Sequence, residues 1–503
     1  MTEAHPREDT AERYDTVPYW SRAFSQTHPA RLTTIGTLFG MDPPPIERCR
    51  ALELGCSDGG NLIPMAARLP RSEFVGIDVS AVQVEAGRAA IADLGLTNLA
   101  LEALNLSDLD ASFGEFDYII AHGVYSWVPE HVRDQLLAIC RQNLSASGIA
   151  YVSYNTYPGW HWRGIARELV RYRAQQASGA QAQIQAAREL ADELLPAFAS
   201  EAQSAEGGAY ATLISQELER LRDKDDAYLF HEYLEADNDP VYFHQFVERA
   251  SARGLQYLGE AEFKSMFAGE GSAAAAQALD RLAPDLIQAE QYRDILYNRT
   301  FRQTLLCHQE VSLQRRLSPE RVKPLAAASQ AQPTTEASDH QAVTFADAQG
   351  NTLTTQAPIA KAALLALAQA WPQALPFPQL LQQARSRLLE REDPAREERQ
   401  LAEQLLLGYS VGLVALHGRA LPLAATAGPY PMADAVSRYQ AQRNGWATNR
   451  RHQSIDLAQA ESQLLALLDG SRDRADLAAA LGEPPECIEQ RLARLARDAL
   501  LVA

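Results

Sequence analysis

The chain has 503 residues, of which 46% are hydrophobic and 22% charged, enough for two or three globular domains. No apolar stretch of about 18 residues offers a membrane span, and the polar first residues do not resemble a signal peptide, so we expect a cytoplasmic protein without membrane insertion. The formal net charge of -18 disfavours nucleic acid as a partner. Five scattered cysteines without CxxC spacing predict reduced thiols and no metal site.

Strands and helices alternate in the first third of the chain. We expect strands at 49–55, 73–78, 98–105, 116–123 and 148–155, and helices at 59–70, 80–95 and 129–144. Ser80 is the expected cap of the second helix and Gly95 its stop. This order is typical of a parallel α/β sheet with crossover helices.

The first strand runs into the glycine-rich loop LELGCSDGGN. The first, third and sixth loop positions hold Gly55, Ser57 and Gly60, so the middle glycine of a dinucleotide fingerprint, which admits a pyrophosphate, is absent. Asp78 ends the second strand, where a carboxylate can accept both ribose hydroxyls. A tight turn alone would explain the glycines, but together with the acid they predict an adenosyl ligand without phosphates.

Four segments carry a family likeness: LELGCSDGGNLIPMA, FVGIDVS, FDYIIAHGVYSWVP and YVSYNTYPGW. They resemble the class I S-adenosylmethionine-dependent methyltransferases. The chain is most similar to the bacterial group with a methyltransferase regulatory domain, to which the rickettsial protein-lysine methyltransferases of outer-membrane protein B belong. The resemblance extends from Tyr14 to His308. It implies a Rossmann-like, seven-stranded sheet with a helical insertion, S-adenosyl-L-methionine as cofactor, and a protein substrate.

The resemblance also implies which residues bind the cofactor. They are Tyr14 and Tyr19 before the first strand, Glu53, Gly55, Cys56, Gly60 and Asn61 in the glycine loop, Asp78 and Val79 at the ribose, Asn105 and Leu106 at the adenine, and His122 after the fourth strand. Asn105 stands where many relatives have an acid, and Asp108 is the alternative. The segment ERYDTVPYWSRAFSQTHPARL is expected to fold over the cofactor as a lid; a helix packed on the sheet is the alternative.

Aromatic side chains follow the fourth and fifth strands. Tyr125 and Trp127 lie in the first of these loops, and Tyr154, Asn155, Tyr157 and Trp160 in the second. Aromatic faces at the carboxyl ends of strands can hold a sulfonium or an ammonium, although core packing explains each ring equally well. For in-line methyl transfer to a lysine amine, we expect Tyr154 and Asn155 to orient the amine, Trp127 to line the site and His122 to accept a proton.

Residues 165–221 have the helical periodicity of a cap over the sheet. We expect DPVYFHQFVERASARGLQYLGEAEF and FRQTLLCHQ to add the sixth and seventh strands. The stretch YLFHEYLEADNDPVYFHQF matches the regulatory-domain motif of the family. Its residues His231, Glu232 and His244 are irregularly spaced, so aromatic packing along an acceptor channel is favoured over a metal site.

The remaining chain predicts a flexible linker over 324–341, a hairpin around Gly350, and two similar halves of three helices and a short strand. The predicted domains are thus 1–160 (lid and cofactor-binding core), 161–310 (cap and last strands), 311–341 (linker) and 342–503 (an α+β, winged-helix-like domain).

Winged helices often bind DNA, so a regulator is an alternative for this domain. Glu486 and Glu489 at the start of its last helix disfavour phosphates, and Arg443, Arg450 and Arg451 form its only basic cluster. We therefore favour a docking module, or a homodimer formed through this domain or the cap. For the whole chain, three functions stay open: a protein-lysine methyltransferase, a small-molecule methyltransferase, and a catalytically silent regulator that binds S-adenosylmethionine.

Overall fold

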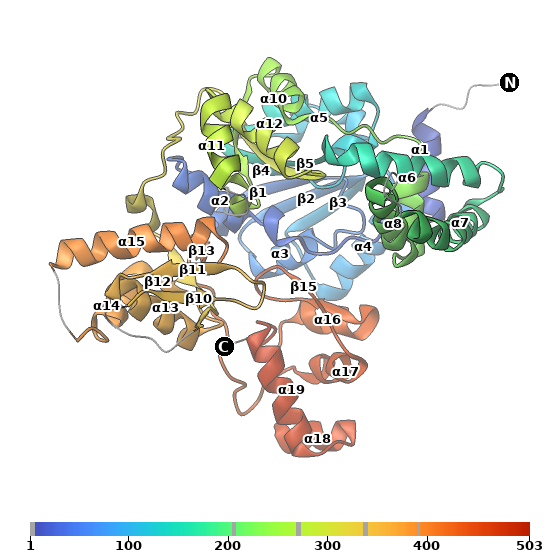
Figure 1. Cartoon of the computed structure of the whole chain (residues 1–503). Coiled ribbons are helices and arrows are strands. Elements are labelled where there is room, and N and C mark those ends of the chain that lie inside the picture. Colours follow the sequence, from blue (N-terminus) through green and yellow to red (C-terminus); the bar gives the residue numbers. More distant parts are fainter. Residues whose placement is uncertain (1–5, 204–207, 268–272, 335–340, 390–392, 503) are drawn as a thin grey trace.

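A computed structural model describes residues 6–203, 208–267, 273–334, 341–389 and 393–502 (Figure 1). Its centre is one seven-stranded sheet of order β3-β2-β1-β4-β5-β7-β6. The strands are β1 (Arg50–Leu54), β2 (Glu73–Asp78), β3 (Leu99–Ala103), β4 (Phe116–Ala121), β5 (Leu144–Asn155), β6 (Leu255–Glu260) and β7 (Phe301–His308). Only β7 runs antiparallel to its neighbours β5 and β6 among these strands. The predicted class I methyltransferase sheet is confirmed, including its completion by two strands from late in the chain.

Helices cover both faces of this sheet (Figure 1). On one face lie α2 (Pro29–Leu38), α3 (Leu62–Arg68) and α4 (Ala81–Leu94), and on the other α5 (Glu130–Gln142), α10 (Phe243–Ala252) and α12 (Leu286–Leu296), with α11 (Ala273–Leu282) next to α12. The Ser80 side chain accepts a hydrogen bond from the Gln83 N–H, and Gly95 ends α4 with a left-handed φ of 63°. Both ends of α4 therefore form as the sequence predicts.

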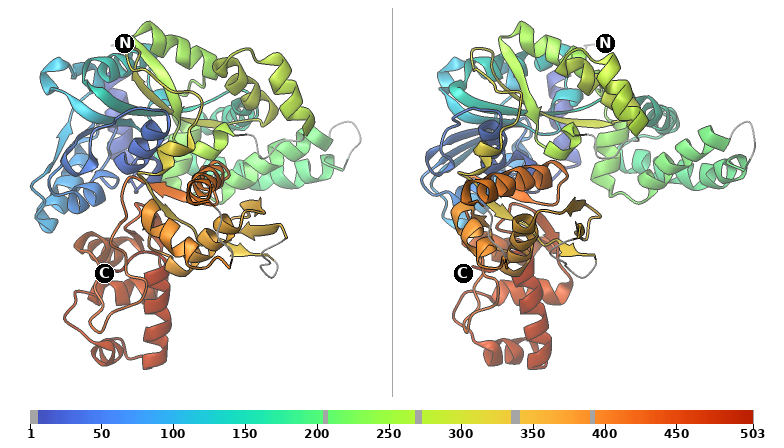
Figure 2. Two further views of the ribbon diagram at one scale, coloured as in Figure 1. Left: turned by 90° about the vertical axis from the view of Figure 1, so that its left-hand side faces the viewer. Right: turned by 60° about the vertical axis from the view of Figure 1, so that its left-hand side comes forward.

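The insertion between β5 and β6 is helical and extends away from the sheet (Figure 2). It contains α6 (Gly159–Ala174), α7 (Ala180–Glu201), α8 (Gly208–Arg222), α9 (Asp226–Leu229) and a π-helical turn at Phe230–Leu234. These helices bury a core of their own, in which Val170, Ile184 and Leu218 are almost inaccessible to solvent. The first helix, α1 (Pro6–Thr16), contacts α4.

The predicted flexible linker is wrong for the residues that the structure describes there. Residues 326–328 form β8 (Ala326–Ala328), the buried central strand between β12 (Leu375–Pro376) and β13 (Ala415–His417). Another three-stranded sheet joins β9 (Gln332–Pro333), β10 (Val343–Ala346) and β11 (Thr352–Thr355), and it includes the predicted hairpin around Gly350. Residues 335–340 lie outside the described residues. The small alanine side chains of 326–328 suggested a linker in the sequence, yet they pack in a short buried strand.

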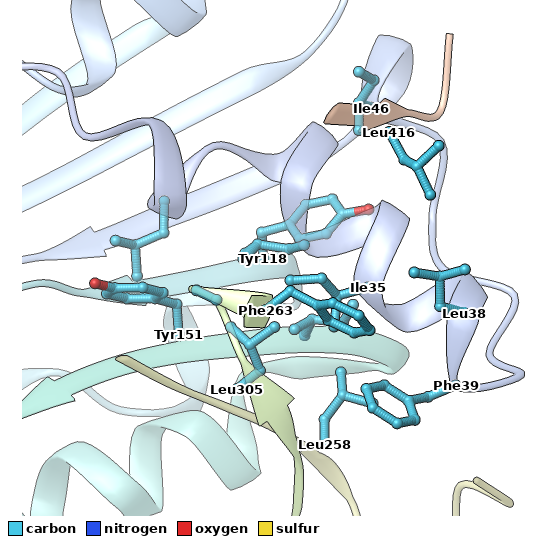
Figure 3. Close-up of a cluster of buried hydrophobic side chains, with 14 of the residues drawn as sticks. Ile35, Leu38, Phe39, Ile46, Tyr118, Tyr151, Leu258, Phe263, Leu305 and Leu416 are labelled. Carbon is cyan, nitrogen blue, oxygen red and sulfur yellow. The ribbon is translucent and has the colours of Figure 1, made fainter. Parts of the chain in front are cut away.

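The first half of the C-terminal region packs into the main core. Its helices are α13 (Pro358–Ala370), α14 (Phe377–Arg385) and α15 (Pro394–Ser410). Leu416 of β13 lies close to Ile46 at the edge of the core cluster that also holds Ile35, Tyr118 and Tyr151 (Figure 3). This half is therefore continuous with the methyltransferase sheet rather than a separate body.

The second half has its own hydrophobic core, built around Leu464, Leu477 and Leu492. It contains α16 (Ala435–Asn444), the hairpin β14 (Trp446–Thr448) and β15 (Ser454–Asp456), and α17 (Gln459–Leu467), α18 (Arg474–Leu481) and α19 (Pro485–Arg497). The predicted domain 342–503 thus holds two hydrophobic units. Among the described residues, no helix has both the length and the apolar character to cross a membrane.

Candidate active site

The glycine-rich loop between β1 and α3 is tightly enclosed. Gly55 and Gly59 have φ of 75° and 74°, a conformation that costs glycine little. A Cβ atom on Gly55 would lie 2.5 Å from Val124 Cγ2, and one on Gly60 would lie 2.2 Å from the Ser21 carbonyl oxygen. Gly60, which the sequence assigned to ligand access, is thus also needed for close approach of the chain's own N-terminal segment.

Asp78 fixes this loop to the end of β2. Its Oδ2 accepts the Ser57 N–H at 2.8 Å, and its Oδ1 accepts the Ser80 N–H at 2.9 Å. Burial raises the pKa of the Asp78 carboxyl. Each oxygen keeps a lone pair for a further donor, so the position suits ribose hydroxyls. Val79, the other residue predicted to bind near the ribose, follows Asp78 directly in the chain.

Glu53 lies under the loop with one oxygen satisfied and one free. Asn61 Nδ2 donates to Glu53 Oε1 at 2.7 Å, whereas Oε2 is buried and has no hydrogen-bond partner among the described residues. Burial raises the pKa of Glu53 to about 8. A buried carboxylate oxygen without a donor is costly, and an ammonium group would satisfy it. The amino group of S-adenosylmethionine fits this requirement.

The N-terminal segment covers the loop through its backbone. The Ser57 hydroxyl donates to the Tyr19 carbonyl at 2.8 Å, the Ser21 N–H donates to Asp58 Oδ1 at 3.0 Å, and the Phe24 N–H donates to Asn61 Oδ1 at 3.1 Å. This is the placement that a lid requires. Asp58, which sequence reasoning missed, is engaged only because two distant segments meet there.

Tyr14 and Tyr19, predicted cofactor contacts, lie against the regulatory-domain motif. The Tyr14 ring stacks on His231 with 4.2 Å between ring centroids, and Tyr19 meets the same ring edge-on at 5.6 Å. His231 Nε2 donates to the Val17 carbonyl at 2.6 Å. His244 instead bonds to Gln291 Oε1 through Nδ1, at 2.8 Å. Each histidine is thus held by its own neighbours, and the described residues contain no cluster of three or more metal-ligating side chains.

His122 follows β4 behind the lid. Its ring contacts Phe24 at 4.0 Å, and its Nδ1 hydrogen-bonds with the Tyr151 hydroxyl at 2.9 Å. Burial lowers the pKa of His122 to about 4. The imidazole is therefore neutral at physiological pH and a weak proton acceptor for an amine.

The loops after β4 and β5 converge, as their strand-end positions predict. The Asn155 N–H donates to Ser126 Oγ at 2.9 Å, and Asn155 Nδ2 donates to Asn238 Oδ1 at 3.2 Å. Trp127 meets Trp160 edge-on at 6.2 Å. Asn155 and Trp127 thus share one region next to the regulatory-domain motif.

Tyr154 is placed differently. Its side chain is 1% exposed, its hydroxyl hydrogen-bonds with Thr304 Oγ1 at 3.0 Å, and its ring stacks on Phe246. The hydroxyl is therefore committed to the core, and the catalytic role expected for Tyr154 stays a prediction that this placement does not favour.

The remaining predicted contacts lie near the sheet edge or inside the loop. Asn105 Oδ1 accepts the Ser107 N–H at 2.9 Å and caps a short turn that contains the half-buried Leu106. Cys56 is buried, and burial raises the pKa of its thiol. Cys56 therefore contributes packing and backbone rather than a reactive thiolate.

Comparisons with known proteins match this architecture. Family models match a methyltransferase domain at residues 52–150, a predicted methyltransferase regulatory domain at 225–308, and the C-terminal winged helix domain of PKMT at 429–500. The uncharacterized protein RP789 of Rickettsia prowazekii is 33% identical over 473 residues, which is 92% of this chain and 84% of that protein. A second R. prowazekii protein, RP028, is 39% identical over 49% of this chain and 96% of its own length.

Among solved structures, PKMT2 from Rickettsia typhi in complex with AdoHcy aligns over 97% of this chain and 100% of that chain, with 30% identity and a TM-score of 0.85. The predicted resemblance is confirmed, and the similarity extends beyond Tyr14–His308 to nearly the whole chain. The chain belongs to the PKMT family of S-adenosylmethionine-dependent methyltransferases.

Proposed function

We propose that this methyltransferase acts on the side-chain amine of a protein lysine. The observation that carries the proposal is the full-length similarity to PKMT2, which includes the PKMT winged-helix domain as well as the catalytic sheet. A small-molecule methyltransferase needs only the sheet and a closed pocket, and it would not require this added domain.

The cofactor residues divide the work by chemistry. Glu53 Oε2 receives the amino group, Asp78 receives the ribose hydroxyls, and Asn105 and Leu106 lie at the adenine end. His122 and the lid exclude water from the reacting centre. When bound, S-adenosylmethionine would supply a methyl group on a positively charged sulfur for in-line transfer to an amine nitrogen, with the sulfur as the leaving group that keeps the C–S electron pair.

We assign the acceptor ammonium to the side of Tyr14 that faces the regulatory-domain motif. The Tyr14 ring stacks on His231, the residue before Glu232 in the chain, and burial together with the charges of Glu235, Asp78 and Glu232 raises the pKa of Tyr14. Burial, followed by the charge of Glu232, also raises the pKa of Tyr19. A carboxylate among aromatic rings suits a primary ammonium.

Glu232 then has a role that the sequence did not reveal. Burial raises the pKa of Glu232 to about 7, which is near the pH at which a general base works best. In this proposal Glu232 takes the proton from the lysine ammonium, and the Asn155 amide orients the nitrogen lone pair. The motif was visible in sequence, but the irregular spacing of its residues did not indicate that burial would raise the pKa of Glu232.

The test is methyl transfer from radiolabelled S-adenosylmethionine into lysate of the source cell, separated into protein and small-molecule fractions. The proposal expects label in protein, recovered as methyl-lysine after hydrolysis, and no label with Asp78→Ala. Label only in small molecules would favour the second function. Cofactor binding without transfer to either fraction would favour the silent regulator.

The basic cluster of the C-terminal region supports docking within the chain rather than DNA binding. Arg443 pairs with Asp93 of α4 at 3.3 Å, and the Arg451 guanidinium lies 3.7 Å from the centre of the Trp371 ring. These arginines thus face the protein itself. A homodimer and a cytoplasmic location stay predictions; light scattering of the purified chain tests the former.

A further inference from the structure

One buried hydrogen bond joins the winged-helix domain to the glycine loop of the methyltransferase. The turn between β14 and β15 carries His452, which is 3% exposed, and its Nε2 lies 2.8 Å from Asn61 Oδ1. Asn61 is fully buried and in turn holds Glu53. A residue 391 positions away in the chain therefore ends directly beneath the cofactor loop.

Hydrogen bonds within the turn fix the backbone on both sides of His452. Asn449 Oδ1 accepts the backbone N–H groups of Arg451 and Gln453 at 2.9 and 3.0 Å. His452 has a φ of 60°, a left-handed conformation that costs a non-glycine residue energy and persists only where the surroundings hold it.

Arg68 at the end of α3 anchors the same hairpin from the methyltransferase side. It pairs with Asp434 at 2.9 Å and donates to the Thr448 carbonyl at 2.7 Å. The hairpin that carries His452 is therefore bonded directly to the methyltransferase sheet domain.

The hydrogen-bond directions follow from Asn61. Its Oδ1 already accepts the Phe24 N–H, and its Nδ2 donates to Glu53 Oε1 and to Thr27 Oγ1. His452 Nε2 must consequently carry the proton and donate. Burial lowers the pKa of His452, which keeps the ring neutral, and Nδ1 is buried with no hydrogen-bond partner in the described part of the chain. The imidazole thus fixes the amide so that its NH2 group faces the carboxylate.

We infer that His452 is a positioning residue for the cofactor: through Asn61 it holds Glu53 so that the free carboxylate oxygen meets the amino group of S-adenosylmethionine. The winged-helix domain is then part of the cofactor site, although no residue of it needs to touch the cofactor. The inference rests on the proposed role of Glu53 and is independent of the identity of the methyl acceptor.

Two ligands separate positioning from simple folding. S-Adenosylhomocysteine carries the amino group, whereas methylthioadenosine has the same nucleoside without the amino-acid part. We would titrate both into the full chain by calorimetry, using His452→Phe, which keeps an aromatic ring of somewhat larger size but cannot donate, and His452→Gln, which keeps a donor. A lost buried hydrogen bond to a polar neighbour predicts about tenfold weaker S-adenosylhomocysteine binding for His452→Phe, and methylthioadenosine binding within about twofold of the wild type.

The controls fix the interpretation. Arg443→Ala removes a contact between the same two domains without touching Asn61, and it should change neither affinity. His452→Gln should recover most of the S-adenosylhomocysteine affinity. Equal weakening of both ligands by His452→Phe would make His452 a purely structural residue, and unchanged binding of both would remove it from the site; either result overturns the inference. Because no methyl acceptor is used, failure of the lysine proposal would leave this result intact.

Discussion

Replacing Glu53 by glutamine should stabilise the ligand-free protein at high pH but weaken cofactor binding. In the free enzyme burial raises its pKa from an ordinary 4.5 to about 8, so the folded state holds a proton that the unfolded state has lost. The stability that this proton contributes is complete below the unfolded pKa of 4.5 and disappears as the pH rises through about 8. Glu53→Gln has no proton to lose at this position. At pH 9 the ligand-free variant should therefore be more stable than the wild type, whereas at pH 5 it should not.

The size follows from the shift. At about 1.4 kcal/mol per pKa unit, the change from 4.5 to about 8 corresponds to a ceiling of about 5 kcal/mol. The new amide N–H of glutamine has no buried acceptor at the Oε2 position, which costs roughly 1–3 kcal/mol. About 2–4 kcal/mol remains, or roughly 2–5 °C in the melting temperature of a cooperative unit of about 400 residues.

Calorimetric melting of both proteins without ligand, at pH 5 and pH 9, measures this effect. The variant should gain stability over the wild type only at the higher pH, while its affinity for S-adenosylhomocysteine falls because the amide cannot balance the ammonium charge. A gain that is equal at both pH values, or no gain at pH 9, would refute the assignment of a raised pKa to this carboxyl.

Three further outcomes are expected. Gly60→Ala places a Cβ 2.2 Å from the Ser21 carbonyl and should weaken cofactor binding at least about tenfold by displacing the lid, whereas Gly164→Ala, which has open space around it, should leave calorimetric titrations unchanged. Asp78→Ala removes both loop hydrogen bonds and the ribose acceptor and should weaken binding by about 100-fold in the same titration; retention of affinity would place the ribose elsewhere. Glu232→Gln should lower kcat by about 100-fold with unchanged cofactor affinity, and it should abolish the rise of kcat with pH through about 7; a variant that keeps this rise would exclude Glu232 as the base.

The sheet and the cofactor loop were predictable because their signals are local. Strand and helix periodicity, the cap at Ser80, the stop at Gly95 and the acid at Asp78 each depend on a few neighbouring residues. The number of strands follows from these signals together with the family likeness, whereas the structure supplies their order.

Other features depend on partners that local patterns cannot identify. Tyr154 lies next to the end of a strand that is covered on both faces, so its residue type does not reveal whether the hydroxyl meets Thr304 or the cofactor. The alanines of β8 suggest a linker until two distant strands pair with them.

The sequence by itself determined that this chain folds as a class I methyltransferase, and it predicted the loop at which the nucleoside binds, since strand-end glycines and acids act within a short stretch of backbone. Only the tertiary structure decided which distant groups meet around this loop: Tyr14 stacks on His231, and His452 hydrogen-bonds to Asn61. Such contacts join segments hundreds of residues apart, and their geometry is set by domain packing rather than by spacing along the chain.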